Sequence, residues 1–76
     1  MEQTFVIKGK TIELLKLLKA TGLADTGGMA KAMIEDGLVK VDGKTEYRKR
    51  CKLRENQTVE LEGNIVQIKT MANETD

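Results

Sequence analysis

The chain has no histidine and no proline, and among its 76 residues it has one cysteine, Cys51, and two aromatic residues, Phe5 and Tyr47. Without histidine, no nucleophile–histidine pair of the kind that hydrolases use can form. A single cysteine excludes an internal disulfide and a cysteine-based metal cluster, and the acidic residues are not spaced like the oxygen ligands of a calcium loop. We therefore predict that the chain is not an enzyme and binds no cofactor, metal or small-molecule substrate.

Long apolar runs are also missing. None approaches the ~20 residues that a membrane-spanning helix needs, and the N-terminal residues MEQTFVIKGK lack the basic start and long apolar core of a secretory signal. With 39% hydrophobic and 33% charged residues, the composition is that of a folded chain rather than a disordered one. We predict a cytoplasmic protein without a membrane partner, with one domain over residues 1–70 and a polar tail over residues 71–76. We expect it to be a monomer.

Positive charge is concentrated in one part of the chain, although the net charge is only +1. Between Lys40 and Arg54, seven basic residues against Asp42 and Glu46 give a charge of +5, which leaves −4 for the rest of the chain. Such a concentration creates a local positive potential that attracts polyanions. A solvated strand face is the alternative explanation of a basic run. The seven residues are Lys40, Lys44, Arg48, Lys49, Arg50, Lys52 and Arg54.

Two segments have the apolar spacing of amphipathic helices. The first covers residues 12–19, whose isoleucine and leucines form the buried face, with Thr11 as the expected N-cap and Gly22 as the stop. The second begins at Thr26, whose hydroxyl can accept a hydrogen bond from an N–H group of the first turn, and it ends at Gly37. Its expected buried residues are Ala30, Met33 and Ile34.

Gly27 and Gly28 are unusual residues for the start of a helix, because glycine costs roughly 1 kcal/mol relative to alanine in a helix interior. Two explanations remain open. Either the second helix packs so closely on the first that only glycine fits, or the free N–H groups at the positive end of the helix dipole accept a phosphate oxygen.

Alternation of apolar and polar residues predicts the strands. Residues 4–7 form an edge strand. Residues 39–41 form a strand that ends in Asp42–Gly43, a strong signal for a tight hairpin turn. A last hairpin covers residues 59–68 and turns at Gly63–Asn64, and its glutamates make it a poor surface for nucleic acid.

Residues 45–53 predict a basic strand between these hairpins. Alternation places Arg48, Arg50 and Lys52 outward, and it places Tyr47, Lys49, Cys51 and Leu53 inward. Because Lys49 does not suit an inward position, we expect a bulge or irregular backbone there. Cys51 is then a semi-buried structural residue, with a redox role as a distant alternative. At most one ring is free to stack on bases, which favours recognition of the backbone and shape of folded nucleic acid.

A motif within residues 26–43 resembles the core of the S4 RNA-binding domain family, which is also called the alpha-L motif. The residues that match the family spacing are Thr26, Ala30, Lys31, Ile34, Gly37, Val39, Val41, Asp42 and Gly43. The likeness extends over roughly residues 11–62, and the whole chain is similar to the small stand-alone bacterial type, the YbcJ-like proteins. With the patterns above, this resemblance predicts an α+β fold in which two helices pack on one face of a small, mainly antiparallel sheet.

Two positions depart from the family pattern. The family's arginine after the first motif residue is Gly27 here, and the arginine that often opens the first helix is Glu13. Both arginines are usual RNA contacts, so the resemblance implies that Lys31 and the cluster from Arg48 to Lys52 supply the positive charge instead. We expect the basic strand and the start of the second helix to meet at one surface.

We therefore predict a protein that binds structured RNA, such as ribosomal or transfer RNA, mainly through phosphate contacts. The candidate RNA-binding residues are Lys31, Lys44, Arg48, Lys49, Arg50 and Lys52, assisted by the N–H groups of Gly27 and Gly28. Two alternatives remain open. One is a protein-interaction adaptor at the ribosome that uses the face of Met33 and the leucines or the acidic hairpin. The other is a DNA-binding module, since only the family resemblance favours RNA.

Overall fold

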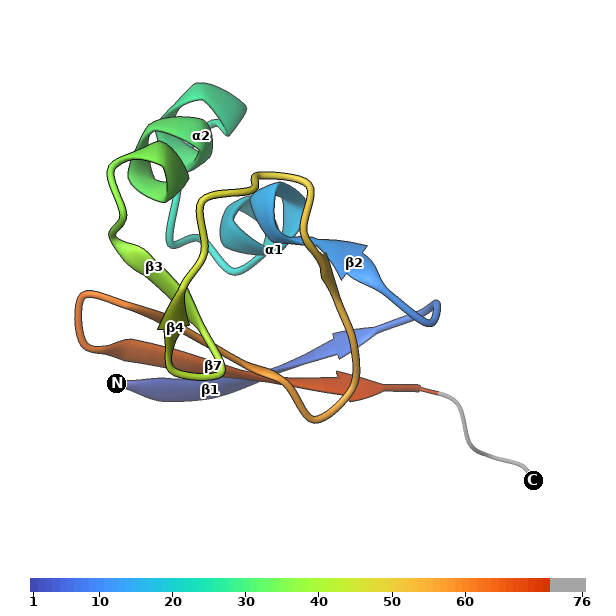
Figure 1. Ribbon diagram of the computed structural model, residues 1–76. Helices are drawn as coiled ribbons and strands as arrows, with labels where there is room; N and C mark the ends of the chain where they lie inside the picture. The colour runs from blue at the N-terminus through green and yellow to red at the C-terminus, as the bar shows by residue number, and fades with distance from the viewer. Residues whose placement is uncertain (72–76) are drawn as a thin grey trace.

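The protein is described over residues 1–71 by a computed structural model, in which two helices lie over one side of a sheet (Figure 1). The helices are α1 (Leu14–Ala20) and α2 (Gly27–Glu35), and the strands are β1 (Glu2–Ile7), β2 (Ile12–Glu13), β3 (Val39–Val41), β4 (Lys44–Thr45), β5 (Lys52–Leu53), β6 (Thr58–Leu61) and β7 (Asn64–Thr70). The predicted tail, apart from Met71, lies outside the described residues.

The main sheet contains five strands in the order β1-β7-β6-β3-β4. β1 pairs with β7 in parallel, and the other three pairs are antiparallel. β2 and β5 form a separate antiparallel pair in which Ile12 lies opposite Leu53. The predicted α+β fold is therefore confirmed, and so is the position of β1 at an edge of the sheet.

The core lies between the helices and the main sheet. Leu14, Leu17 and Leu18 of α1 are fully buried, and they belong to one cluster with the inward-facing residues of β6 and β7. Because these leucines are core residues, they are not free to bind a partner, and the part of the adaptor alternative that uses them is wrong. Within residues 1–71, neither helix is long and apolar enough to cross a membrane.

α1 begins later than the sequence predicts. Its N-cap is Glu13, which makes no side-chain cap hydrogen bond, so the prediction that Thr11 caps the helix is wrong. The reason is that Ile12 and Glu13 are extended and pair with β5. The first free N–H groups of the helix therefore find acceptors elsewhere in the chain.

α2 has the predicted start and stop. The Thr26 hydroxyl accepts a hydrogen bond from the Met29 N–H at 3.1 Å. At the other end, the Gly37 N–H donates to Ile34 O at 3.1 Å and the Leu38 N–H donates to Met33 O at 3.1 Å, which is the Schellman pattern of a helix end. Gly37 has φ +78°, a conformation that favours glycine.

The two explanations of the glycine pair at the start of α2 can now be compared. A Cβ on Gly27 would lie 3.9 Å from Lys19 Cδ, and a Cβ on Gly28 would lie 3.9 Å from Thr26 Oγ1. Both distances are ordinary van der Waals contacts, so alanine would fit at either position. The explanation by close helix packing is therefore wrong.

Both tight hairpins turn through two residues with positive φ, as the type I′ turn requires. Asp42 (φ 52°) and Gly43 (φ 84°) join β3 to β4 as predicted. Glu62 (φ 49°) and Gly63 (φ 85°) join β6 to β7, so the prediction of a Gly63–Asn64 turn is wrong by one residue. In both turns glycine is the second central residue.

The predicted basic strand is wrong over most of its length. β4 pairs with β3 through two residues only, Lys44 and Thr45. Residues 46–51 are called here the crossing segment. The Glu46 N–H still donates to Val39 O of β3 at 2.9 Å, and the chain then leaves the main sheet and passes over α1 to β5 (yellow in Figure 1). A turn closed by a hydrogen bond from the Cys51 N–H to Arg48 O at 3.1 Å contains Lys49, where irregular backbone was predicted.

Candidate nucleic-acid interface

The crossing segment lies where it does because it completes the start of α1. The Leu14 N–H donates to Cys51 O at 2.8 Å, and the Leu15 N–H donates to Lys49 O at 3.0 Å. The first turn of a helix has N–H groups without intrahelical partners, and here the backbone of the crossing segment supplies their acceptors. The bonds fix the backbone on α1 and leave the basic side chains to project from it.

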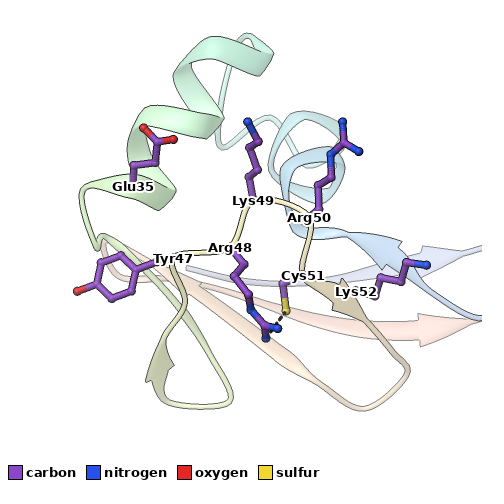
Figure 2. Close-up of a pocket in the computed structure, with 7 residues that line it drawn as sticks. All are labelled: Glu35, Tyr47, Arg48, Lys49, Arg50, Cys51 and Lys52. Carbon is purple, nitrogen blue, oxygen red and sulfur yellow. Dashed lines mark hydrogen bonds between the residues drawn. The ribbon is translucent and has the colours of Figure 1, made fainter.

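These side chains project in different directions (Figure 2). Lys49 and Arg50 extend toward the helices, Arg48 extends the opposite way toward the sulfur of Cys51, and Lys52 extends outward from β5 (Figure 2). Arg48, Arg50 and Lys52 are exposed, as predicted, and Lys49 is half-buried. Cys51 is half-buried and Leu53 is buried, so the predicted inward positions of these two residues are confirmed.

Tyr47 does not occupy the inward position that alternation predicts. Tyr47 is 63% exposed, because the chain has already left the sheet at this point. A hollow of about 760 Å³ runs along this side of the crossing segment and is lined by Glu35, Tyr47, Arg48, Lys49, Arg50, Cys51 and Lys52. It therefore combines a ring, an acidic side chain and basic side chains.

A second hollow of about 650 Å³ brings the side chains of Lys44 and Arg54 together with those of Arg48 and Lys52. Its other lining residues are Val41, Asp42, Glu46, Cys51, Glu55 and Gln57. Arg54 was not among the candidate residues from the sequence, although it belongs to the same basic run. The signal that could have found it is its position directly after the inward-facing Leu53.

Glu46 holds the side chain of Arg48. The Nε of Arg48 donates to Oε2 of Glu46 at 2.9 Å, its Nη2 donates to Oε1 at 3.3 Å, and its backbone N–H donates to Oε2 at 2.9 Å. These bonds lower the pKa of Glu46 from 4.5 to about 2. The side-chain hydrogen bonds from Arg48 have the largest effect, and the hydrogen bond from its backbone N–H has the next largest. Arg48 is therefore partly neutralised before any ligand arrives.

Cys51 has no feature of an activated thiol. The pKa of the Cys51 thiol is raised mainly by burial and further by the neighbouring Glu46 carboxylate. A raised pKa disfavours the reactive thiolate. Residues 1–71 contain no cluster of three or more metal-ligating side chains. This agrees with a structural role for Cys51.

The first turn of α2 lies apart from the crossing segment. Gly27 is next to Lys19 near the end of α1, whereas the crossing segment is bonded to the start of α1. The α2 residue that lines the first hollow is Glu35, at the other end of this nine-residue helix, about 12 Å along its axis. The basic segment thus meets the end of α2 rather than its start, contrary to the expectation. Lys31 is exposed on α2 and lines neither hollow.

Residues 5–69 match the family model of the S4 domain. The chain belongs to the S4 domain family. It is 49% identical over 57 residues to YbcJ of Escherichia coli (strain K12), which is described as a candidate RNA-binding protein, and the match covers 75% of this chain and 81% of that one. The identity to YbcJ of Shigella flexneri is the same, over the same length.

Two solved structures place this S4 domain among folds of the same kind. The solution structure of E. coli YbcJ, whose alpha-L motif is described as involved in RNA binding, has a TM-score of 0.68 and 46% identity, covering 87% of this chain and 85% of that one. The 30S ribosomal protein S4e from Thermoplasma acidophilum has a TM-score of 0.65 and 30% identity, covering 76% of this chain and 31% of that one. The predicted alpha-L motif is confirmed.

Proposed function

We propose that this S4 domain binds structured RNA, such as ribosomal or transfer RNA, mainly by phosphate contacts from the basic side chains around the crossing segment. The observation that carries this proposal is that Arg48, Lys49, Arg50 and Lys52 line one hollow along the crossing segment. A second hollow brings Arg48 and Lys52 together with Lys44. Family membership supports RNA as the ligand. We further propose that the protein acts as a monomer in the cytoplasm, by binding rather than catalysis.

The proposed contacts have a physical basis in the way the segment is held. Its backbone is bonded to the first turn of α1, so the basic side chains start from a fixed position and only their own torsion angles must be ordered on binding. Arg54 lines the same hollow as Lys44 and Lys52, and we add it to the proposed contacts. Lys31 and the N–H groups of Gly27 and Gly28 would form a second, smaller contact region at the start of α2.

Salt dependence of binding tests this proposal. If four to six phosphates are neutralised, log K should fall against log[salt] with a slope of roughly −3 to −5. The variant R48A/K49A/R50A should flatten the slope by roughly two to three units, since each phosphate contact contributes about 0.7–0.9. Binding would be measured by fluorescence anisotropy with a labelled transfer RNA.

The matched control removes three positive charges from lysines that lie outside the crossing segment. Lys40 and Lys69 are exposed on the sheet face opposite the helices, and Lys8 is exposed just beyond β1. The variant K8A/K40A/K69A should keep most of the slope although its net charge equals that of the first variant. Equal loss of slope in both variants would contradict the proposed site. Competition with duplex DNA at the same salt concentration distinguishes RNA binding from the DNA-binding alternative.

A further inference from the structure

The exposed ring of Tyr47 lies where an unpaired base could stack on it. Among residues 1–71 it is the one exposed aromatic side chain, because Phe5, the other aromatic residue, is half-buried against the core. Its ring lies at one end of the first hollow, on the same side of the crossing segment as Glu35 (Figure 2). An exposed ring at the end of a basic surface is the feature that proteins use to stack an unpaired base.

The end of α2 holds this ring in place. A Cβ on Gly37 would lie 3.2 Å from Tyr47 Oη and 3.3 Å from Tyr47 Cε1. The ring edge therefore rests on the backbone of Gly37 in space that a larger residue would occupy. Glycine is favoured at position 37 because the end of α2 requires a positive φ there. The same residue leaves the space that the ring of Tyr47 occupies. A ring that is already held by this contact loses little conformational entropy when a base stacks on its open face.

The charge at this end of the hollow suits a base rather than a phosphate. Within the described part of the chain, the ion pair that forms is Arg48–Glu46, so the carboxylate of Glu35 has no cationic partner. A free carboxylate repels phosphate, but it accepts two hydrogen bonds from a pair of adjacent N–H groups. Guanine presents such a pair, N1–H and N2–H, on its Watson–Crick edge. On the same edge, adenine and cytosine place an acceptor beside the donor, and uracil has a single N–H between two acceptors.

We propose that this end of the hollow binds one unpaired guanine of the RNA. The base stacks on the ring of Tyr47 and donates its N1–H and N2–H groups to the carboxylate of Glu35. Lys49, which lines the same hollow, contacts the phosphate of that nucleotide. This inference rests on the proposed RNA binding and adds to it one base-reading site.

The test uses synthetic RNA hairpins at fixed salt concentration. One has a fully paired stem, and four others carry a single bulged guanine, adenine, cytosine or uracil. The wild-type protein should bind the bulged-guanine hairpin roughly tenfold or more tightly than the paired one, the size expected for one stacked base. The single tyrosine, in a chain without tryptophan, gives a direct second readout. Its fluorescence should be quenched more by the bulged-guanine hairpin than by the paired one.

Three substitutions separate the contributions of ring and carboxylate. Y47L should lose the preference for the bulged hairpin and keep the affinity for the paired one, whereas Y47F should keep both. E35Q should keep the gain from a bulge but lose the preference for guanine over adenine, because the amide offers one acceptor and one donor. Tyr47 and Glu35 are both exposed, so the circular dichroism spectra of the three variants should match that of the wild-type protein.

The outcomes distinguish the two proposals. Equal affinity for all five hairpins, or a guanine preference that survives Y47L, would overturn the base-reading site while the salt-dependent RNA binding stands. Absence of salt-dependent binding to every hairpin would overturn the proposed function, and this inference with it.

Discussion

Replacement of Glu46 by glutamine should strengthen RNA binding. In the free protein the Glu46 carboxylate accepts two side-chain hydrogen bonds and one backbone hydrogen bond from Arg48. Its pKa of about 2 keeps it fully charged at neutral pH. Glutamine keeps an oxygen that can accept the backbone N–H but carries no charge, so Arg48 becomes a full cation at the proposed interface.

The size of the effect follows from counting charges. One full additional phosphate contact makes the slope of log K against log[salt] steeper by about 0.9. Because Arg48 is only partly neutralised in the wild type, the slope of E46Q should steepen by less than this, and its advantage over the wild-type protein should shrink by at most roughly three- to fourfold between about 50 and 200 mM salt. Anisotropy titrations of a labelled transfer RNA at several salt concentrations measure both quantities. The control is E62Q, which removes the same charge from the exposed turn between β6 and β7 and should change the slope little.

Weaker binding by E46Q would refute this reasoning. The Arg48 side chain is 77% exposed and the Glu46 side chain is 17% exposed, so Arg48 covers its partner and still faces solvent. If the main effect of Glu46 were to orient the guanidinium for a phosphate, its removal would lower affinity without making the slope steeper. The sign of the change therefore decides between neutralisation and orientation.

The same pair gives a pH dependence of stability. The pKa of Glu46 in the folded protein, about 2, lies below its ordinary value of 4.5. The charged carboxylate therefore stabilises the fold, and this contribution is complete above pH ~4.5 and is lost as the pH falls toward ~2. Because the Arg48 side chain is 77% exposed, solvent screens the ion pair and its contribution to stability is small. The difference in Tm between wild type and E46Q should shrink as the pH is lowered through this window, and a constant difference would contradict the assignment.

The remaining predictions concern caps, turns and the thiol. Gly37→Ala should destabilise the protein by roughly 1–2 kcal/mol in urea unfolding, because positive φ is unfavourable for alanine and its Cβ would contact the ring of Tyr47. Gly9→Ala, where a Cβ would have open space around it, should not destabilise the protein. Thr26→Ala should cost about 1 kcal/mol through the lost cap, and Thr11→Ala, at the position wrongly predicted as a cap, should stay within about 0.5 kcal/mol of wild type. Cys51 should react with a thiol reagent more slowly at neutral pH than a free model thiol, because its pKa is raised, and a faster reaction would contradict that environment.

The parts of the fold that the sequence predicts correctly depend on local interactions. Thr26 and Gly37 bound α2 through hydrogen bonds within four residues. Asp42 and Gly43 set the β3–β4 turn by their own backbone conformations. Such signals act between close neighbours, so their residue types alone reveal them.

The errors arise where distant segments decide the structure. The alternation of residues 45–53 predicts one strand with a single misfit at Lys49. The chain instead leaves the sheet, and its backbone supplies the acceptors Cys51 O and Lys49 O to the N–H groups of Leu14 and Leu15. The start of α1 is likewise set by β5, which holds Ile12 in an extended conformation. No local pattern contains these pairings.

The candidate site was predicted in the same uneven way. Charge counting identified the basic run, and its outward members Arg48, Arg50 and Lys52 are exposed as predicted, because a basic residue at a polar position is exposed in either backbone conformation. It could not reveal which of them share a hollow, that Glu46 neutralises Arg48, or that the ring of Tyr47 lies over Gly37. Those relations depend on where the crossing segment leaves β4.

An NMR titration of ¹⁵N-labelled protein with a structured RNA tests the central claim most directly. If the crossing segment is the RNA-binding surface, the amide signals of residues 46–54 and Lys44 should shift most, and those of Lys40, Gln67 and Lys69 on the opposite sheet face should stay in place. Shifts confined to the β6–β7 hairpin or to the opposite sheet face, with the crossing segment unchanged, would contradict the account.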